Sequence, residues 1–377
     1  MNFELSEEHR LLRETVRDFA EKEIKPYGRE YDEKAEYPWD VLRKAAKLGY
    51  VGADLPEEYG GSNLDYFGCA IISEEFCRAD SGVGSALMTA TLGCPMVKYF
   101  GSEVQKEKFL PKLAKDTVGA FSLTEPEAGS DPSGMRTTAT LDGDEYVLNG
   151  TKIFVTNGGV AGLVIVFART PAEEAKRSIT AFLVEKGTPG LKVGKKESKL
   201  GIRSSNTTEL ILEDCRVPKE NVLGGVGEGY RIALASLDSG RVGIAAQSLG
   251  IAQAALDASI RYSKERVQFG SPIARFQAIQ WMIADMATEI EAARLLTYKA
   301  AYLRGKGERF TKEAAMAKLY ASEVAMRAAR NAVQIHGGYG FTREYEVERL
   351  FRDAKGTEIY EGTSEIQRMV IAGQLLR

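Results

Sequence analysis

The chain has 377 residues, of which 44% are hydrophobic and 27% charged, the composition of a soluble globular protein with two or three packed units. Its 50 basic and 53 acidic residues leave a net charge of −3 and form no basic block of the kind that binds nucleic acid. Two histidines and four cysteines without CxxC spacing leave little for Ser-His-Asp catalysis or a zinc site, so we expect no bound metal.

The N-terminus, MNFELSEEHR, carries acidic residues and lacks the apolar stretch of a signal peptide. No run of 18 or more apolar residues is present, which excludes a conventional membrane-spanning helix. The cysteines are typical of reduced structural thiols. We therefore expect a cytoplasmic protein, or one of the mitochondrial matrix if this is a mature chain that has lost its transit peptide.

Residues 1–118 are predicted to form an α-helical domain. In the stretch LSEEHRLLRETVRDFAEKEI, the apolar residues Leu11, Val16, Phe19 and Ile24 recur near helical spacing with charges between them. The same helical pattern recurs in WDVLRKAAKLGY and SEVQKEKFLPKLAK, and no segment of this region alternates apolar and polar residues as a strand would.

Residues 119–227 are predicted to form a β domain. Short β-branched and aromatic runs such as LVIVFART, ITAFLVEKG and TELILEDCRV are characteristic of strands. The pairs Asp142-Gly143, Asn149-Gly150 and Asn157-Gly158 are predicted to form the turns that separate strands. Strands without intervening helices favour an antiparallel sandwich or barrel.

Residues 228–377 are predicted to form a helical bundle, because three long Ala-rich amphipathic stretches follow one another with short connections. The glycine cluster GGVGEG at 224–229 lacks GxGxxG spacing, so we interpret it as a loop joining two domains. In QIHGGYGF, Gly337 and Gly338 end a helix, and His336 is interpreted as a packing residue.

Two segments of the β domain each allow two interpretations. The run TEPEAGSDPSG at 124–134 is either a plain loop or a turn whose free backbone N–H groups cradle a pyrophosphate. KIFVTNGG at 152–159 is either a hairpin, with Phe154 and Val155 in the core, or an aromatic face and the Thr156 hydroxyl presented to a planar cofactor. Local sequence favours the hairpin.

The segment IYEGTSEIQR at 359–368 also allows two interpretations. Ser364 and Gln367 have capping-box spacing, so a helix is predicted to begin at Ser364, and an acid just before it is ordinary helix-end chemistry. However, Gly362 permits close approach of a ligand, and Tyr360 adds an apolar wall. A Glu361 carboxylate that a ligand desolvates is well suited to act as a base.

The order of these motifs resembles one family over nearly the whole chain. TEPEAGSD, KIFVTNGG, LDSGRVGIAAQSLGIAQAALD, ERVQFGSPI, QIHGGYG and IYEGTSEIQR are similar to the motifs of acyl-CoA dehydrogenases, most of all short-chain (butyryl-CoA) and short or branched-chain members. The resemblance implies an N-terminal α-helical domain (1–118), a central antiparallel β domain (119–227) and a C-terminal four-helix bundle (228–377).

The resemblance implies an FAD-dependent reaction on a short-chain or short branched-chain acyl-CoA. Glu361 would remove the α-proton while flavin N(5) takes the β-hydride, leaving a trans-2-enoyl-CoA. Electrons would pass to an electron-transfer flavoprotein, and the family assembles as homotetramers. Two alternatives remain: an acyl-CoA oxidase that uses dioxygen, and a scaffold that binds flavin or acyl-CoA without turnover. Chain length depends on a pocket around residues 85–92 and the bundle, which the sequence does not fix.

The same resemblance assigns site residues. The catalytic base is Glu361. The residues implied to bind FAD are Phe121, Leu123, Thr124, Gly129, Ser130, Phe154, Val155, Thr156, Arg266, Phe269, Gln277, Gln334, Gly337, Gly338, Thr363, Ser364 and Glu365, of which Arg266 through Gly338 would meet the FAD of a neighbouring subunit. The residues implied to bind the substrate are Ser130, Asp238, Arg241, Tyr360 and Gly362.

Departures from relatives narrow the choice. Some relatives place the base immediately before the arginine of LDxxR, and here that position is Gly240, so Glu361 has no competitor. Glutaryl-CoA relatives carry an arginine where this chain has Gly84, which disfavours a dicarboxylate substrate. Phe276 replaces a histidine of some relatives, and we expect little consequence.

Overall fold

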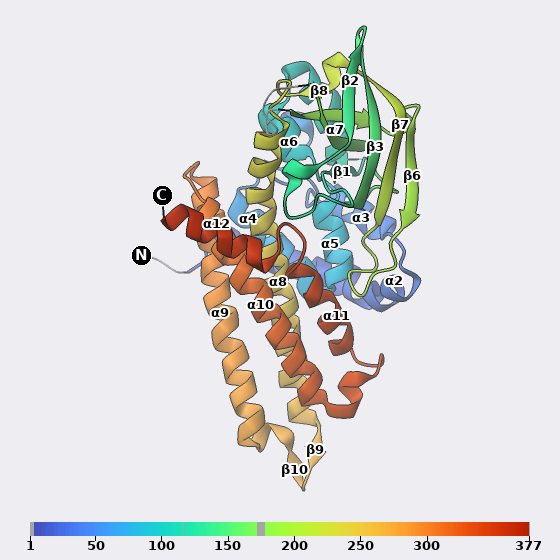
Figure 1. Ribbon diagram of the computed structural model, residues 1–377. Helices are drawn as coiled ribbons and strands as arrows, with labels where there is room; N and C mark the ends of the chain where they lie inside the picture. Colours follow the sequence, from blue (N-terminus) through green and yellow to red (C-terminus); the bar gives the residue numbers. More distant parts are fainter. Residues whose placement is uncertain (1–3, 116, 172–177, 377) are drawn as a thin grey trace.

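The computed structural model describes residues 4–115, 117–171 and 178–376. A helical N-terminal part is followed by a β-sheet and then by long C-terminal helices that extend away from the sheet (Figure 1). Within the described ranges, no helix is both long and apolar enough to cross a membrane. The α–β–α order expected from the sequence is therefore confirmed.

The N-terminal part buries one apolar face of each helix in a common core. Ser6 caps the first helix by accepting a hydrogen bond from the His9 backbone N–H at 3.2 Å, and Val16 and Phe19 then point into that core. The helices are α1 (Glu7–Glu23), α2 (Gly28–Lys34), α3 (Trp39–Lys47), α4 (Tyr66–Ala79), α5 (Ser81–Thr89), α6 (Cys94–Phe100) and α7 (Glu103–Lys115).

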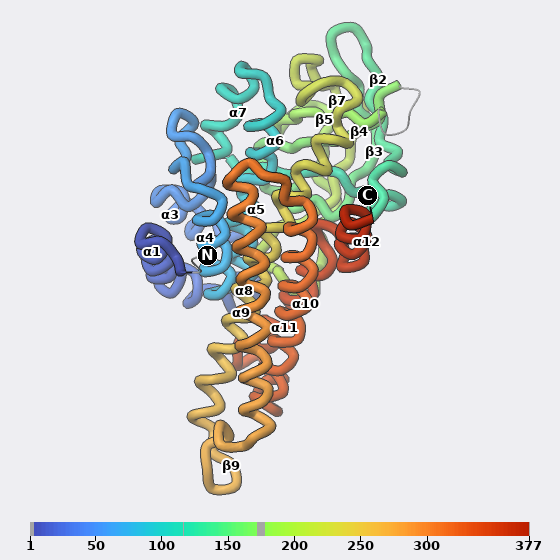
Figure 2. Tube along the Cα trace, turned by 90° about the vertical axis from the view of Figure 1, so that its left-hand side faces the viewer, coloured from blue at the N-terminus to red at the C-terminus, as the bar shows by residue number. Residues whose placement is uncertain are grey.

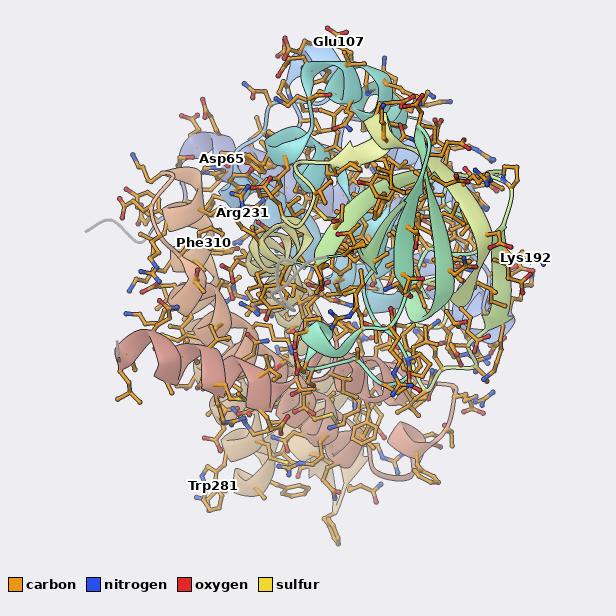
Figure 3. The ribbon with its side chains drawn as sticks, turned by 45° about the horizontal axis from the view of Figure 1, so that its top comes forward. Asp65, Glu107, Lys192, Arg231, Trp281 and Phe310 are labelled. Atoms are coloured by element: carbon orange, nitrogen blue, oxygen red, sulfur yellow. The ribbon has the colours of Figure 1, made fainter. Side chains whose placement is uncertain are left out.

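The sheet has the strand order β6-β7-β3-β2-β4-β5-β8, and β1 pairs with β4. Its strands β4 and β5 are buried along all but their last residue, because helices cover one face and other strands the other. The bounds are β1 (Gly119–Ser122), β2 (Thr138–Asp142), β3 (Glu145–Thr156), β4 (Leu163–Arg169), β5 (Ile179–Glu185), β6 (Leu191–Lys196), β7 (Thr207–Pro218) and β8 (Val222–Leu223). Figure 3 shows Lys192 of β6 at the outer edge of the sheet.

Two details of the sheet differ from the sequence-based expectation. Most pairings are antiparallel, but β1 and β2 both pair with β4 in parallel. Asn149-Gly150 lies inside β3 and makes no turn, because Asn149 still pairs with Thr138 of β2 and the pairing to β7 continues past Gly150. A Cβ at position 150 would lie 2.4 Å from the Thr137 hydroxyl, so this glycine permits a close approach of two chain segments. Asp142-Gly143 does form the β2–β3 turn.

The C-terminal bundle is built on α8 (Gly229–Glu265), α9 (Gln277–Gly305) and α10 (Thr311–His336), with α11 (Val347–Thr357) packed against α8 and α10. Its buried positions are mostly alanines, whose small side chains let the helices approach closely. Figure 2 shows α8, α9 and α10 running side by side to the hairpin of β9 (Val267–Gln268) and β10 (Ser271–Pro272). The last helix, α12 (Ser364–Leu375), packs on α10.

The GGVGEG segment lies in the connection between β8 and α8, as expected. His336 ends α10, is 4% exposed and stacks on Tyr262, so its interpretation as a packing residue is confirmed. The N-cap of α12 is Thr363, whose hydroxyl accepts from the Ile366 N–H. The helix begins at Ser364, as predicted, but Ser364 is its first helical residue and the capping side chain is that of Thr363.

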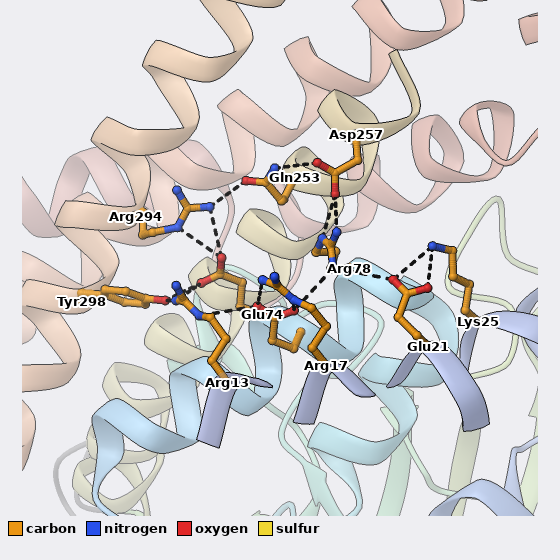
Figure 4. Close-up of polar contacts among 11 residues, drawn as sticks. Arg13, Arg17, Glu21, Lys25, Glu74, Arg78, Gln253, Asp257, Arg294 and Tyr298 are labelled. Carbon is orange, nitrogen blue, oxygen red and sulfur yellow. Dashed lines mark hydrogen bonds and ion pairs between the residues drawn. The ribbon is translucent and has the colours of Figure 1, made fainter. Parts of the chain in front are cut away.

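A charged cluster ties the N-terminal helices to the bundle (Figure 4). Glu74 and Glu75 of α4 are both 2% exposed. Arg294 of α9 lies 3.1 Å from Glu74, and Arg17 of α1 lies 2.7 Å from Glu75. Buried carboxylates are costly unless paired, so these contacts hold α1, α4 and α9 in a fixed arrangement. That arrangement fixes one wall of the cavity described next.

Candidate active site

A cavity of about 200 Å³ lies between α4, α5 and α8, beneath β1. Its wall is largely apolar and includes Val51, Ile72, Phe76, Leu87, Leu92 and Ile244. Glu361 and Gly240 also line it. The pocket therefore involves the region around residues 85–92 together with the bundle, where the sequence placed the determinants of chain length. Its charged lining residues are Glu361, Asp54 and Arg304, and an enclosure this small and largely apolar suits a short aliphatic ligand.

The backbone around Glu361 is a strained turn that is held from behind. Glu361 has φ +56° and Gly362 has φ +92°, both in the left-handed region. The side-chain amide of Gln367 donates to the carbonyls of Glu361 and Gly362 at 3.1 and 2.8 Å, and Lys318 Nζ donates to the Gly362 carbonyl at 2.7 Å. A left-handed non-glycine residue is costly unless its surroundings enforce it, so these bonds stabilise the turn.

The Glu361 N–H makes no hydrogen bond to an acceptor among the residues that the structure describes. The two carbonyls of the turn are engaged, whereas this donor is not. This N–H is therefore available to an acceptor on a ligand. Glu361 thus offers a ligand both a backbone N–H donor and a side-chain carboxylate.

Gly240 of α8 makes room for the Glu361 side chain. A Cβ at position 240 would lie 2.5 Å from Glu361 Oε2 and 2.9 Å from its Cδ. Contacts below 3.0 Å do not occur between real atoms of this kind, so any side chain at 240 would displace the carboxylate. The two positions at which relatives place the base thus converge on one point of the cavity.

Burial raises the pKa of Glu361 from its usual 4.5 to about 7, against the opposing effect of the positive charges on Arg241 and Lys318. The carboxyl is enclosed by protein except where it faces the cavity. A base with a pKa near neutrality is partly ionised in the cell and still basic enough to take a proton.

Four of the five predicted substrate residues lie next to Glu361 in sequence or on α8, and the fifth, Ser130, lies elsewhere. Arg241 is 5% exposed and donates to Asp238 at 2.5 Å, and Asp238 also accepts from the Thr311 hydroxyl at 2.6 Å. The Tyr360 hydroxyl donates to the side chain of Gln247, on α8, at 3.0 Å. This bond anchors the residue that precedes Glu361. Gly362 belongs to the turn, and Ser130 is exposed in the loop after β1.

The structure brings together two of the segments predicted to hold FAD. Phe121 lines the cavity with Glu361, and the Thr124 carbonyl accepts from the Ile153 N–H at 3.0 Å. This bond places the run that contains Leu123 and Thr124 beside the segment that carries Phe154, Val155 and Thr156. Gly129 and Ser130 lie further along the same run and are exposed, and a Cβ at Gly129 would meet nothing within 4 Å.

Phe154 is not a core residue, contrary to the hairpin interpretation. Its ring is 61% exposed and its φ is +54° at an irregularity in β3–β7 pairing, whereas Val155 is 1% exposed in the β core. The irregularity turns the aromatic side chain outward while Thr156, half-buried, still pairs with Thr207. The exposed ring and adjacent hydroxyl match the alternative interpretation, in which this edge faces a planar cofactor.

The loop that follows β1 is anchored by a buried ion pair. Lys152 is fully buried and donates to Glu125 at 2.7 Å, and Glu125 also accepts from the backbone N–H groups of Arg136 and Thr137 at 2.5 and 3.1 Å. Burial lowers the pKa of Lys152 to about 8, with Glu125 opposing the shift. The TEPEAGSD run is thus a fixed platform whose exposed glycine and serine face outward.

A second group of predicted residues lies at the far end of the bundle. Arg266, Phe269, Gly337 and Gly338 line an open groove of about 590 Å³. Gln277 begins α9 beside this groove, and Gln334 is exposed on the last turn of α10. The Phe269 ring, at the tip of the β9–β10 hairpin, is 96% exposed. Figure 3 labels Trp281, another exposed aromatic residue at this end of the molecule.

Thr363, Ser364 and Glu365 follow the Glu361 turn at the N-terminus of α12. The Ser364 hydroxyl is buried and has no hydrogen-bond partner among the described residues. An unsatisfied buried hydroxyl beside the turn is a donor and acceptor that a bound ligand can engage.

Comparison with family models matches all three parts of the chain. Residues 6–117 match the acyl-CoA dehydrogenase N-terminal domain, residues 120–215 the middle domain and residues 227–376 the C-terminal domain. The short-chain specific acyl-CoA dehydrogenase of Clostridium acetobutylicum is 48% identical over 379 residues, covering 100% of both chains. The chain belongs to the acyl-CoA dehydrogenase family. It is an oxidoreductase of that family, with a flavin cofactor.

Solved structures of this acyl-CoA dehydrogenase family share its whole fold. The butyryl-CoA dehydrogenase of Megasphaera elsdenii superimposes with a TM-score of 0.97 at 48% identity and 100% coverage of both chains. A chain in a structure of the electron transferring flavoprotein of Acidaminococcus fermentans gives a TM-score of 0.98, with the same identity and coverage. The family fold anticipated from the motifs is thus confirmed.

Sequence reasoning missed Lys318. It lies in the stretch EAAMAKLYAS, where the flanking alanines at 314, 315, 317 and 321 are buried. A lysine in phase with the buried face of an amphipathic helix was the available signal. The tertiary fold was needed to show that it meets the Glu361 turn from another helix.

Proposed function

We propose that this protein is an FAD-dependent acyl-CoA dehydrogenase that converts a short-chain or short branched-chain acyl-CoA to the trans-2-enoyl-CoA. The observation that carries the proposal is the single strained glutamate, Glu361, in a small apolar cavity next to Phe121. The apolar wall accommodates a short acyl group, and the similarity to short-chain and butyryl-CoA enzymes supports this size class.

Glu361 removes the proton from the α-carbon of the thioester. Its raised pKa of about 7 makes it a stronger base than an exposed glutamate, and an acyl chain that fills the cavity would exclude water from it. The free Glu361 N–H donates to the thioester carbonyl oxygen, where negative charge develops as the proton leaves. Arg241, held by Asp238, supplies positive potential behind the same point.

The residues present fit a flavin. Phe154 and Thr156 offer an exposed ring and a hydroxyl, the anchored TEPEAGSD run offers Leu123, Thr124, Gly129 and Ser130, and the Ser364 hydroxyl lacks a partner. Bound FAD supplies the hydride acceptor for the β-carbon at its N(5) atom.

The remaining FAD residues support a homotetramer in which the cofactor lies between subunits. Gly240 and Arg266 lie at positions about 26 residues apart along α8, which is about 39 Å at 1.5 Å per residue. Arg266, Phe269, Gly337 and Gly338 are therefore too far from Glu361 to serve the same site, and they are placed to meet the FAD of a neighbouring copy.

An electron-transfer flavoprotein is the proposed electron acceptor, supported by the match to a chain in the Acidaminococcus fermentans flavoprotein structure. We also propose division of the chain into domains at 1–118, 119–227 and 228–377. The first cut falls between α7 and β1, and the second just before α8.

The test is anaerobic bleaching of the flavin band by a panel of short, medium and branched acyl-CoA thioesters. Glu361→Gln is expected to retain flavin and to bind acyl-CoA, yet to be reduced at least about 10³-fold more slowly, because the amide cannot accept the proton. Glu358→Gln is the matched control, since that glutamate pairs with Lys355 at 2.6 Å and does not line the cavity.

Three outcomes separate the alternatives. Hydrogen peroxide release without an added acceptor would identify an oxidase. Binding of acyl-CoA without bleaching by any thioester of the panel would identify a scaffold. Near-normal reduction of the Glu361→Gln variant would remove Glu361 from the role of base.

A further inference from the structure

Lys318 is a buried cation beside the Glu361 turn. It is 0% exposed on α10, and its ammonium donates to the Gly362 carbonyl at 2.7 Å. Among the described residues it makes no ion pair within 4 Å, unlike Arg241, which lies 2.5 Å from Asp238. Its charge is thus not neutralised by a directly bonded carboxylate.

Packing alone does not account for a lysine here. Removing an ammonium from water costs free energy, and burial lowers the pKa of Lys318 to about 8, with Glu361 the strongest opposing influence. A methionine would fill the same volume among the surrounding alanines without this cost. The cost of burying Lys318 therefore indicates a role for its charge or its hydrogen bond at the neighbouring Glu361 turn.

The hydrogen bond acts on the residue that follows the base. The Gly362 carbonyl accepts from both Lys318 and Gln367, so the turn is held from α10 and from α12 at once. Because Glu361 and Gly362 both have positive φ, release of this carbonyl would let the turn relax and move the carboxylate.

We propose that Lys318 is a positioning residue for Glu361, holding its turn through the Gly362 carbonyl and keeping its carboxylate ionised through an unneutralised positive charge. This rests on the proposed function, in which Glu361 is the base. Lys318 touches neither the reacting atoms nor the cavity and acts through Glu361.

The charges around the pair set the expected sign. Arg241 from α8 and Lys318 from α10 are the cations that act on Glu361. Lys318 itself is influenced by Glu361, Arg241, Glu358 and Glu365. Arg241 has the larger effect on Glu361 and Lys318 the second, so loss of Lys318 removes one of the two positive charges that favour ionised Glu361. The Glu361 pKa must then rise.

The experiment compares Lys318→Met with Lys312→Met, a lysine of the same helix that is partly exposed and lies 3.4 Å from Glu313. Flavin reduction by butyryl-CoA is followed from pH 5.5 to 9. In Lys318→Met the acidic limb is expected to move to higher pH by about one unit, which slows reduction roughly 10-fold near pH 6 and less above pH 8. Lys312→Met is expected to keep the parent profile.

A second measurement needs neither substrate nor turnover. Infrared titration of ¹³C-glutamate-labelled holoenzyme, with the Glu361→Gln spectrum subtracted, reports the protonation of Glu361 directly. The midpoint is expected to rise in Lys318→Met and to stay fixed in Lys312→Met. This readout separates the two proposals, because it still tests Lys318 even if no acyl-CoA bleaches the parent.

Lys318→Gln guards against a variant that fails to fold. It keeps an N–H donor near the Gly362 carbonyl and removes only the charge, so it is expected to show the same rise in the Glu361 midpoint with less loss of the maximal rate. An unchanged midpoint in either folded variant overturns the electrostatic role. Unchanged maximal rates in Lys318→Met overturn the positioning role.

Discussion

Gly240→Ala tests whether the carboxylate occupies its catalytic position in the structure. The new methyl carbon would lie 2.5 Å from Glu361 Oε2, 2.9 Å from Cδ and 3.5 Å from Oε1. A carbon–oxygen contact relaxes to about 3.3 Å or more. The neighbour that must give is the far end of a side chain, so the carboxylate is expected to swing by close to 1 Å and leave the backbone of α8 in place.

The consequences for rate and for stability have opposite signs. Displacement of a reacting group by about 1 Å costs roughly 10²-fold in rate, because the approach to the α-carbon is no longer aligned. Replacing glycine by alanine within a helix stabilises it by about 0.5–1 kcal/mol. Gly240→Ala is therefore expected to reduce its flavin about 10²-fold more slowly while unfolding at the same or a higher urea concentration.

The assay is stopped-flow bleaching of the flavin by butyryl-CoA, with urea unfolding of the same preparations. Gly373→Ala is the control, because it makes the same substitution within α12, away from the cavity, where the new methyl would meet nothing within 4 Å. It should gain similar stability without the loss of rate. Reduction of Gly240→Ala at the parent rate would show that the carboxylate position in this cavity is not the one used in catalysis.

Two further predictions concern buried charge. Lys152→Met leaves Glu125, which is 3% exposed, as an unpaired buried carboxylate. It is expected to lower the free energy of unfolding by about 3 kcal/mol and to weaken flavin retention. Adding Glu125→Gln should recover most of the lost stability, and a Lys152→Met variant as stable as the parent would contradict the prediction. Glu361 has a folded-state pKa of about 7 against 4.5 when unfolded, so the folded protein binds the extra proton and the parent loses stability as pH rises from about 4.5 to 7. Above pH 7 the free energy of unfolding of Glu361→Gln, measured in urea, should therefore exceed that of the parent by about 2 kcal/mol, and this difference should vanish below pH 4.5. Equal stability of the two proteins at pH 8 would refute the raised pKa.

The environment of Glu361 explains why the features that make it a good base also lower the stability of the fold. A glutamate that is to act as a base must be desolvated and held in an unfavourable backbone conformation, and both conditions cost folding free energy. The surroundings offset that cost with Gln367 and Lys318 behind the turn and with Arg241 beside the carboxylate. Each of these partners comes from a different helix.

Helical periodicity anticipated the long bundle helices, and β-branched runs anticipated the strands, because these patterns reflect the local chain. Local rules failed where a contact from elsewhere decided the geometry. Asn149-Gly150 has turn chemistry, yet β2 and β7 hold it inside a strand. Phe154 is hydrophobic, yet an irregularity in the pairing to β7 leaves it exposed. Ser364 has cap spacing, yet the cap is Thr363.

The amino-acid sequence by itself determined the order of elements, the family and the identity of the candidate base, because motif order and periodicity are properties of the linear chain. Only the tertiary structure decided why that glutamate is special. The missing side chain at Gly240, the ammonium of Lys318 and the amide of Gln367 come from three separate helices. Desolvation and electrostatic potential depend on distances in space, and no spacing along the sequence encodes them.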